Sequence, residues 1–451
     1  MPTRRFPISV AGVIAAALVN IPTALAQAPV GYYASVDPST PATLRQSVHA
    51  VIKDHLRFPY TAATTDTWDI LELADQDVNN SAHIVDLYKN QSILKQGGGN
   101  SFYNREHSWP NSFGFPNDGA TNSPYTDCHA LFLSDSGYNS SRGNNVYRGC
   151  LSGCSEKVTV LTNGQGGGSG LYPGNSNWRA GSGATGSWET WQRRRGDVAR
   201  ALLYLDVRYE GGLSGSGNAE PDLILTDDEA LIAASNTGNN EAVAYMGMRS
   251  VLLQWHLDDP VDERERGRDN VVFRFQANRN PFIDHPEWVE CVFNNACSVG
   301  TAFCFGDGSG TGCPCGNNSA VGAQEGCLNS LGTGGKLTAM GRASLTSDTV
   351  VLAGTRMPNG GVLYFQGTTQ ASLAFGDGLL CVTGSVVRLG TRFNVLSASQ
   401  YPDPVDTRIS VQGGVTATGT REYQAWYRDA ATFCTPSTFN LTNGWRITWG
   451  A

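Results

Sequence analysis

Apolar residues recur at helical spacing in four stretches of the first part of the chain, at residues 43–58, 188–209, 241–255 and 262–276. In the first stretch, leucine, valine and isoleucine side chains fall on one face, Thr43 is placed to cap the start, and Pro59 ends the helix. Gly196 interrupts the second stretch. The pattern therefore predicts a mainly helical first part.

The pattern changes after Cys297. Helical periodicity is lost, and short β-prone runs such as Val362–Phe365 alternate with Gly-rich turns. The residues Phe-Gly-Asp-Gly occur at 305–308 and again at 375–378, a weak repeat that turn chemistry explains. Many short strands separated by such turns are typical of a β-sandwich.

The length of 451 residues supports two domains rather than one core. We predict the fold class α+β, with a mainly helical domain at residues 27–298 and an all-β, sandwich-like domain at residues 299–451. The boundary is placed near residues 298–303, where the composition changes.

Residues 1–26 have the features of a signal peptide. Arg4 and Arg5 form a short basic region, an apolar stretch follows from Ile8 to Val19, and Ala24-Leu25-Ala26 offers a cleavage site. That stretch is too short to span a bilayer, and no later stretch is long enough. We therefore expect an exported protein without a membrane span, either periplasmic or extracellular.

The chain has 11 cysteines, which in an exported protein indicates disulfide bonds. Cys150 with Cys154, and Cys291 with Cys297, are close enough in sequence to close small loops. Cys128 is then left over, and we expect it to be free and buried.

Six further cysteines follow residue 300 and can close three bridges, whose pairing the sequence does not determine. A zinc site is the alternative for Cys313-Pro-Cys315. Because no histidine follows residue 285, disulfides are the favoured interpretation.

The charge balance argues mildly against a nucleic-acid binder. Residues 27–298 contain 21 Lys and Arg against 32 Asp and Glu, a net charge of −11, and residues 299–451 have a net charge of +1. Positive charge is instead local, at Arg193, Arg194, Arg195, Arg200, Arg208, Arg264, Arg266 and Arg268. An enzyme needs only a local cationic groove. The acidic net charge therefore argues more strongly against a stable nucleic-acid-binding module than against an enzyme. Any of these arginines can equally belong to a solvated face.

The densest group of chemically capable residues runs from Asn104 to Pro110 and resumes at Asp127. Hydrolysis of a phosphodiester needs a base to activate water and a cation for the developing charge. His107 suits the base, and Glu106 and Asn139 are oxygen ligands suited to a hard ion such as Mg²⁺. On a strand, Glu106 and His107 point to opposite faces, so both reach one site only where the strand ends, as Pro110 indicates.

The run Asn104–Pro110, with Asp127-x-His129 and the run Asn139–Asn144, resembles the bacterial endonuclease I family, a group of ββα-metal (His-Me finger) nucleases. The likeness covers about residues 43–292. Further family-like segments occur in the expected order, at residues 67–71, 196–200 and 278–286.

The resemblance implies a β-hairpin at about residues 101–133 and a helix at about 135–143. It assigns His107 as the general base and Glu106 and Asn139 as ligands of a divalent cation. Arg142 is expected either to contact a phosphate or to support the metal-binding loop.

Asp127 and His129 are expected on the second strand of that hairpin, where they orient the site. We expect His285 to cap the final helix of the domain. The departure from the family is Cys128, where relatives commonly carry an aliphatic residue, and this swap preserves a small apolar side chain.

The function implied is a secreted, non-specific endonuclease that hydrolyses DNA, with RNA as a second candidate substrate, and leaves 5′-phosphate ends. The expected cofactor is Mg²⁺ or another divalent cation such as Ca²⁺ or Mn²⁺, and recognition would run through the nucleic-acid backbone. The alternative is a catalytically silent adhesion or surface-binding protein on a nuclease scaffold, against which the intact Glu106, His107 and Asn139 argue. A zinc peptidase would need a His-Glu-x-x-His pattern, which the sequence lacks.

Residues 304–451 resemble a Cys-containing C-terminal module of secreted proteins from planctomycete-type bacteria. The likeness is carried by residues 363–369 and 433–442. It assigns no activity to this part of the chain.

Overall fold

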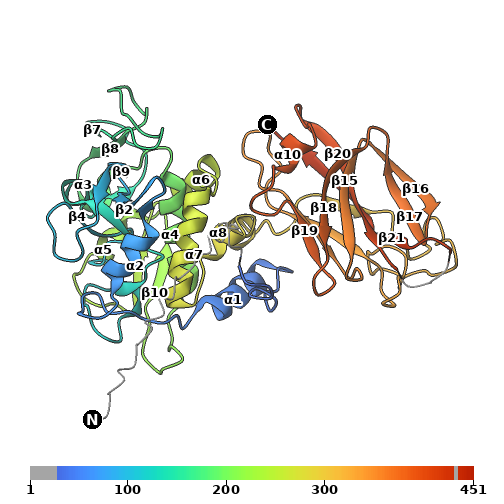
Figure 1. The fold of residues 1–451 in the computed structure, drawn as a ribbon, viewed down its shortest axis with the longest axis horizontal. Helices are drawn as coiled ribbons and strands as arrows, with labels where there is room; N and C mark the ends of the chain where they lie inside the picture. The colour runs from blue at the N-terminus through green and yellow to red at the C-terminus, as the bar shows by residue number, and fades with distance from the viewer. Residues whose placement is uncertain (1–27, 431–434) are drawn as a thin grey trace, which may run out of the picture.

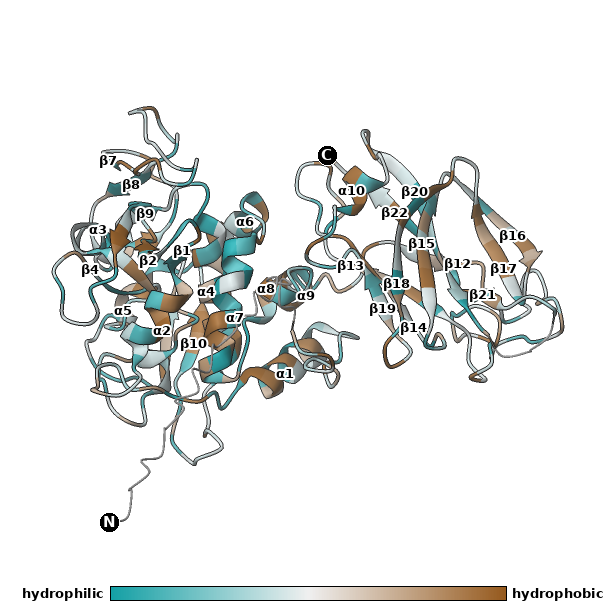
Figure 2. Ribbon diagram, viewed as in Figure 1, coloured by the Kyte–Doolittle hydropathy of each residue, from teal (hydrophilic) through white to brown (hydrophobic). Residues whose placement is uncertain are grey.

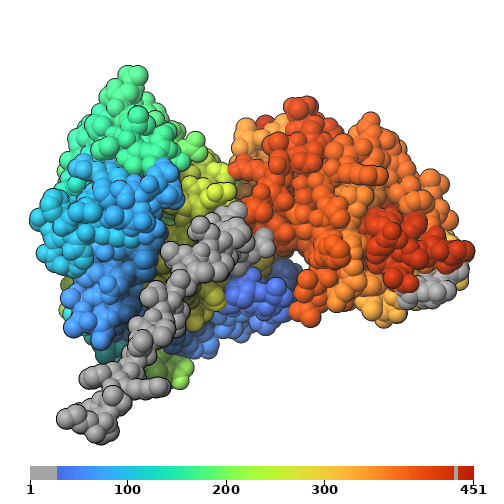
Figure 3. All heavy atoms as spheres, viewed as in Figure 1, coloured from blue at the N-terminus to red at the C-terminus, as the bar shows by residue number. Residues whose placement is uncertain are grey.

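The computed structural model describes residues 28–430 and 435–451, which form two lobes side by side (Figures 1 and 3). Helices and small sheets make up the first lobe, and strands dominate from Thr301 onward. The predicted α+β class is confirmed, and the structure shows a mixed α/β first region and a β-rich second region. The predicted signal peptide at residues 1–26 lies outside the described residues. In the part that is described, no helix is long and apolar enough to cross a membrane.

The first predicted helix is shorter than expected. Helix α1 spans Pro41–Ile52, and its N-cap is Thr40, whose side chain accepts a hydrogen bond from the Thr43 backbone N–H in a capping box. The helix ends because Lys53 is extended and Asp54 has a positive φ of 58°. The prediction that it continues to residue 58 was wrong.

Two other predicted helices begin later than expected. Residues Ser187–Glu189 form strand β9, and helix α4 spans Arg195–Arg208. Gly196 lies in the first turn of α4, where a Cβ would collide with the carbonyl oxygen of Asp259. Likewise, strand β11 (Val243–Met246) precedes helix α6 (Arg249–Asp258). In both cases a short strand occupies the start of a stretch that we expected to be helical.

The fourth predicted helix is confirmed as α7, Glu263–Gln276, with Asp262 as its N-cap. Its first half is hydrophilic and its hydrophobic residues lie in the second half (Figure 2). The other helices of the first lobe are α2 (Thr67–Ala74), α3 (Ser136–Arg142), α5 (Glu229–Ser235), α8 (Pro281–Asp284) and α9 (Trp288–Asn294).

The strands of the first lobe form several small sheets rather than one large one. They are β1 (Gln76–Asp77), β2 (Asn80–Val85), β3 (Ser92–Leu94), β4 (Tyr103–His107), β5 (Leu131–Asp135), β6 (Val146–Tyr147), β7 (Ser155–Lys157), β8 (Asn177–Ala180) and β10 (Asp222–Leu225), besides β9 and β11. Strands β4 and β5 pair only with each other among the described residues.

Helix α4 is the centre of the first lobe. All its residues from Gly196 to Arg208 are buried, and it packs against α1, α6, α8 and β10. A helix buried on every side must neutralise its own charged side chains. The arginines of α4 must therefore form ion pairs or hydrogen bonds within the lobe.

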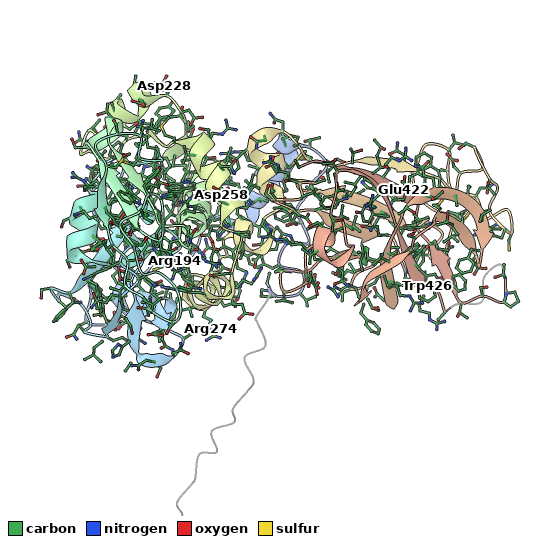
Figure 4. All side chains as sticks on the ribbon, turned by 90° about the horizontal axis from the view of Figure 1, so that it is seen from above. Arg194, Asp228, Asp258, Arg274, Glu422 and Trp426 are labelled. Carbon is green, nitrogen blue, oxygen red and sulfur yellow. A yellow bond between two sulfur atoms is a disulfide. The ribbon has the colours of Figure 1, made fainter. Side chains whose placement is uncertain are left out.

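Four of the arginines expected to form a local cationic groove are buried in ion pairs instead. Arg200 donates two hydrogen bonds of 2.6 Å to Glu265, and Arg208 donates to Glu220 at 2.8 and 2.9 Å. The other two pairs are Arg268 with Asp75 and Arg194 with Asp197. Figure 4 shows Arg194 within the body of the lobe and the exposed Arg274 at its edge. These four side chains are therefore structural and cannot contact phosphate from their buried positions.

The second lobe is built on one sheet with the strand order β12 (Thr301–Phe303), β22 (Gly444–Trp449), β20 (Gly419–Arg428), β15 (Gly361–Gly367) and β18 (Val387–Phe393). Strand β21 (Phe439–Leu441) also pairs with β20. A second sheet comprises β13 (Lys336–Met340), β14 (Val351–Thr355) and β19 (Ser399–Tyr401), and a hairpin comprises β16 (Thr369–Phe375) and β17 (Gly378–Thr383). A short helix, α10, spans Ile409–Gln412.

Side chains alternate across the central sheet as the period of a strand requires. Tyr423, Ala425 and Tyr427 of β20 join the core on one face, whereas Trp426 packs toward the β16–β17 hairpin on the other. The second Phe-Gly-Asp-Gly segment is the tight turn of that hairpin, with Phe375 paired to Gly378. Packing on both faces of the sheet agrees with the predicted sandwich-like architecture.

Both predicted small disulfide loops are present, Cys150–Cys154 and Cys291–Cys297. Cys128 is free and fully buried, as expected. In the second lobe, bridges join Cys304 to Cys381 and Cys313 to Cys327. Cys315 is disulfide-bonded as well, and Cys434 lies outside the described residues. Disulfides rather than zinc are therefore confirmed for the Cys313-Pro-Cys315 segment.

Candidate active site

A strand–strand–helix element carries most of the predicted site residues. Strands β4 and β5 are antiparallel, with Glu106 opposite Phe132 and His107 opposite Leu131, and α3 follows β5 directly. The Asp135 carboxylate caps α3 by accepting hydrogen bonds from the Gly137 and Tyr138 backbone N–H groups at 2.9 and 3.1 Å. The predicted hairpin at 101–133 and helix at 135–143 therefore correspond to observed elements.

One face of β4 is turned toward α3. Asn104 and Glu106, two residues apart on the strand, contact Asn139 and Arg142, three residues apart on the helix. The Asn139 Nδ2 donates to Asn104 Oδ1 at 2.6 Å, and the Arg142 Nη1 lies 3.3 Å from Glu106 Oε1. The structure therefore brings Glu106, Asn139 and Arg142 to one strand–helix interface.

The Glu106 carboxylate is only 2% exposed. Burial raises its pKa, and the nearby Arg142 guanidinium and a hydrogen bond from Tyr88 oppose that shift. The Tyr88 hydroxyl donates to Oε1 at 2.8 Å, on the same oxygen that Arg142 approaches. Among the described residues no hydrogen bond falls on Oε2, so this oxygen is available to a cation.

Asn139 is oriented in a comparable way. Its amide nitrogen is used by Asn104, which leaves Oδ1 without a hydrogen bond from any described residue. A carboxylate oxygen and an amide oxygen are ligands that Mg²⁺ accepts, and Mg²⁺ normally keeps several waters in its shell. The donor atoms therefore fit a hard divalent cation. The described residues contain no cluster of three or more His, Cys, Asp or Glu side chains placed to hold a metal.

His107 is the last residue of β4, so the strand ends where the sequence predicted. Its Nε2 lies 2.9 Å from the carbonyl oxygen of Tyr125. Because a carbonyl oxygen only accepts, Nε2 must carry the proton and Nδ1 then holds a lone pair. Burial lowers the pKa of His107 to about 4, so the ring is neutral at neutral pH. The side chain is thus in the state that a general base needs.

Aromatic rings enclose the His107 imidazole. Tyr60 stacks on it with ring centres 5.8 Å apart, and the Tyr125 ring lies at 4.8 Å. The far side of this assembly is formed by Arg105, whose guanidinium lies 3.2 Å from the centre of the Tyr60 ring. His107 is therefore held by its backbone, by the Tyr125 carbonyl and by ring packing.

Arg142 is 1% exposed, and both of its terminal nitrogens contact protein groups, whereas its Nε has no hydrogen-bond partner among the described residues. Its Nη1 donates to the carbonyl oxygen of His107 at 3.2 Å, and Nη2 donates to that of Ser108 at 2.7 Å. The same guanidinium approaches Glu106. The side chain thus ties α3 to the end of β4.

Asp127 does not lie on the second strand, so that prediction was wrong. It follows a 3₁₀ turn, Ser123–Thr126, and precedes β5. It is fully buried, and it accepts hydrogen bonds from the Tyr204 and Tyr209 hydroxyls at 2.8 and 3.0 Å. Burial acts to raise its pKa, but the nearby His55 and other cations and donors outweigh this effect and lower it to about 2.

His129 also precedes β5, in the turn that follows Asp127. Its Nε2 lies 3.0 Å from the Asn278 carbonyl oxygen and its Nδ1 lies 3.5 Å from Asp269. Burial lowers the pKa of His129 to about 4. Asp127 and His129 thus face the core of the lobe. The turn that carries them follows the segment whose Tyr125 carbonyl contacts His107.

Three other histidines of the first lobe make contacts within the lobe. His285 is the C-cap of α8 and does not cap the final helix α9, whose N-cap is Glu287, so that prediction was wrong. Its ring stacks on Trp288 with ring centres 4.0 Å apart. His55 is buried 3.7 Å from Asp127, and His49 contacts the Val207 carbonyl oxygen at 2.9 Å.

Sequence reasoning missed the tyrosines of the site. Tyr88 lies in the turn after β2 and contacts Glu106, and Tyr147 of β6 contacts Tyr88, with 2.8 Å between the two hydroxyl oxygens. Tyr60 and Tyr125 surround His107. None of these residues belongs to the motif, and a single sequence carries no signal that links them to it.

Comparison with known proteins agrees with this architecture. A family model described as endonuclease I matches residues 40–287, which include the whole strand–strand–helix element. Two similar relatives, from Bacillus subtilis (strain 168) and Bacillus amyloliquefaciens, are each named extracellular ribonuclease. Each is 36% identical over 265 residues, which cover 58% of this chain and 78% of the relative. The family match does not extend into the second lobe.

Proposed function

The chain belongs to the endonuclease I family, and on this premise we propose that residues 27–298 form an exported, divalent-metal-dependent endonuclease. The proposed reaction is hydrolysis of phosphodiester bonds in DNA and RNA, leaving 5′-phosphate ends. The name of the two relatives supports RNA as a substrate alongside DNA. Residues 299–451 are proposed as a separate domain, whose likeness to a planctomycete-type module stays a prediction.

The observation that carries the proposal is the arrangement at the end of β4. The strand ends at His107, whose Nε2 is committed to the Tyr125 carbonyl, so Nδ1 is free to accept a proton. On the neighbouring face, Glu106 Oε2 and Asn139 Oδ1 have no hydrogen bond from a described residue. A base and a pair of oxygen ligands are thus presented by one short element.

We assign the steps to the residues as follows. His107 Nδ1 accepts the proton of the attacking water, and the Tyr125 carbonyl stabilises the imidazolium that results, because Nε2–H already points at it. Glu106 and Asn139 would hold the cation. When bound, a divalent cation neutralises charge on the phosphate oxygens and stabilises the leaving oxygen.

Three further residues are assigned positioning roles. Arg142 ties α3 to the carbonyls of His107 and Ser108, which fixes the base relative to the ligands. Asp127 and His129 anchor the turn before β5 to the core, and through it the segment that carries the Tyr125 carbonyl. We propose no direct contact of these three side chains with substrate.

Export is supported by three observations. The sequence has a signal-peptide pattern, the described residues contain disulfide bonds, and both relatives are named extracellular. The acidic net charge and the buried arginines favour transient, backbone-directed contact with nucleic acid over stable binding.

The test is to incubate the purified protein with plasmid DNA and with RNA, with Mg²⁺, Mn²⁺ or Ca²⁺ and with EDTA, beside the His107→Ala variant. We expect metal-dependent cleavage of both substrates and its loss in the variant. Failure to degrade either substrate in any of these metals would favour the catalytically silent adhesion protein. Full activity in His107→Ala would exclude His107 as the base.

A further inference from the structure

A buried chain of three hydroxyl and carboxylate groups leads from the core to Glu106. The Tyr147 and Tyr88 hydroxyl oxygens lie 2.8 Å apart, and the Tyr88 hydroxyl lies 2.8 Å from Glu106 Oε1. Both tyrosines are fully buried. The residues come from the turn after β2, from β4 and from β6, all in the first lobe, where Figure 1 labels β2 and β4.

The chain has a definite direction. An ionised carboxylate only accepts hydrogen bonds, so the Tyr88 O–H donates to Glu106. The Tyr88 oxygen then accepts from Tyr147, whose hydroxyl has no other partner among the described residues. Each donor in the chain strengthens the next, and a hydrogen bond to a charged group is among the stronger ones.

Tyr88 is itself held rigidly. Its carbonyl oxygen accepts from Asn177 Nδ2 at 2.7 Å, and its ring packs edge-on against Trp188 at 4.8 Å between centres. The preceding carbonyl, of Leu87, accepts from the Trp191 indole at 3.0 Å. The hydroxyl therefore has a fixed position from which to orient the carboxylate.

Two contacts determine which carboxylate oxygen of Glu106 remains available to a cation. Tyr88 and Arg142 both approach Oε1, so the carboxylate cannot rotate without losing contacts to both. Oε2 is left without a hydrogen bond from any described residue. Partners that hold the non-ligating atoms of a metal ligand typically change metal affinity when they are removed.

We propose that Tyr88 is a positioning residue for the cation site, acting through Glu106 and backed by Tyr147. The proposal rests on the proposed function, because it takes Glu106 as a cation ligand. It adds that Tyr88 sets the affinity for the divalent cation rather than the chemistry that follows.

The experiment compares Tyr88→Phe with the wild type by calorimetric titration of Mn²⁺ and by the Mn²⁺ concentration that gives half-maximal cleavage. We expect both the Mn²⁺ dissociation constant and that concentration to rise about 10–100-fold. Cleavage at saturating Mn²⁺ should stay within a few-fold of the wild type. A merely structural role would not produce this separation.

Tyr103→Phe is the matched control. Tyr103 lies on β4 and is fully buried, as Tyr88 is, and its hydroxyl contacts the carboxylate of Glu72, away from the site. Its loss should leave the Mn²⁺ affinity unchanged. If Tyr88→Phe does not fold, as judged by its melting curve, Tyr147→Phe replaces it, because that variant keeps the bond to Glu106 and should raise the dissociation constant several-fold.

Two failures are distinguishable. If the wild type binds Mn²⁺ and cleaves, but the Tyr88→Phe variant binds Mn²⁺ as the wild type does, the positioning role is overturned. If only Tyr147→Phe folds, an unchanged Mn²⁺ dissociation constant in that variant also overturns the positioning role. If the wild type neither binds a divalent cation nor depends on one for cleavage, the proposed function itself fails.

Discussion

The imidazole Nε2 of His107 and the carbonyl oxygen of Tyr125 lie 2.9 Å apart, and this contact fixes which ring nitrogen can act as a base. It also ties the end of β4 to the segment that precedes Asp127. The base is therefore positioned by two parts of the chain that are 18 residues apart.

The first prediction concerns the base itself. His107→Ala should lower the cleavage rate by about 10²–10⁴-fold, because general-base assistance is lost while the cation ligands remain. Added imidazole should restore part of the rate, since the side chain leaves a space between Tyr60 and Tyr125. Rates at saturating metal, with and without imidazole, are the measurement.

His83→Ala is the control for that variant. His83 lies on β2, where its Nδ1 contacts Ser92 at 3.1 Å, away from the site. Its loss should leave cleavage unchanged and insensitive to imidazole. Equal losses in the two variants would mean that the effect of His107→Ala is structural.

The second prediction separates a ligand from the residue that orients it. Asn139→Ala removes an oxygen ligand and should reduce cleavage by at least about 10²-fold, whereas Asn104→Ala removes only the acceptor of the Asn139 amide and should cost about 10-fold. Asn139→Asp keeps an oxygen and should retain more activity than Asn139→Ala. Cleavage across a range of Mg²⁺ concentrations tests the order of the three variants.

The third prediction concerns pH and His129. Burial lowers its folded-state pKa to about 4, below the value of 6.5 expected when the chain is unfolded. Protons therefore bind the unfolded chain first as the pH falls. The stability that neutral, buried His129 contributes is present above pH 6.5 and is lost toward pH 4, by up to about 2–3 kcal/mol.

Urea unfolding of the first lobe at pH 7 and at pH 4.5 measures this loss. His129→Gln keeps a donor for the Asn278 carbonyl but does not titrate, so its stability should fall less over the same interval. If the free energy of unfolding fell equally with pH in the wild type and in the variant, His129 would not be the cause of the loss.

The family resemblance, which rests on two short runs of motif residues, predicted the strand–strand–helix element. The sequence could not predict the helix end at Ile52 or the strand at Ser187–Glu189, because local backbone conformation and pairing with β8 decide these. Tyr88 was not predictable either, since its relation to Glu106 exists only in three dimensions. A sequence motif identifies functional residues that are near each other in sequence. It does not identify residues elsewhere in the chain that only position those functional residues.

The fourth prediction tests whether the lobes are independent. The Cys304–Cys381 bridge spans 77 residues of the second lobe, and a loop of that length restricts the unfolded chain strongly. Replacing both cysteines with serine should destabilise the second lobe by about 2–4 kcal/mol. Cleavage should be unchanged, because the element that carries the site lies in the first lobe. Calorimetry and a cleavage assay on one preparation provide both readings.

The last prediction follows from the buried arginines. Arg200 and Glu265 form a two-bond pair in the core, and breaking one side leaves the other charge buried and unpaired. Arg200→Met should therefore destabilise the first lobe by about 3–5 kcal/mol, and adding Glu265→Leu should recover much of that loss. Arg193→Ala, at an exposed neighbouring position, should change stability by less than about 0.5 kcal/mol. If Arg200 instead contacted phosphate, its replacement would leave stability unchanged and would weaken nucleic-acid binding in low salt, an outcome that equilibrium unfolding and a salt titration of binding would distinguish.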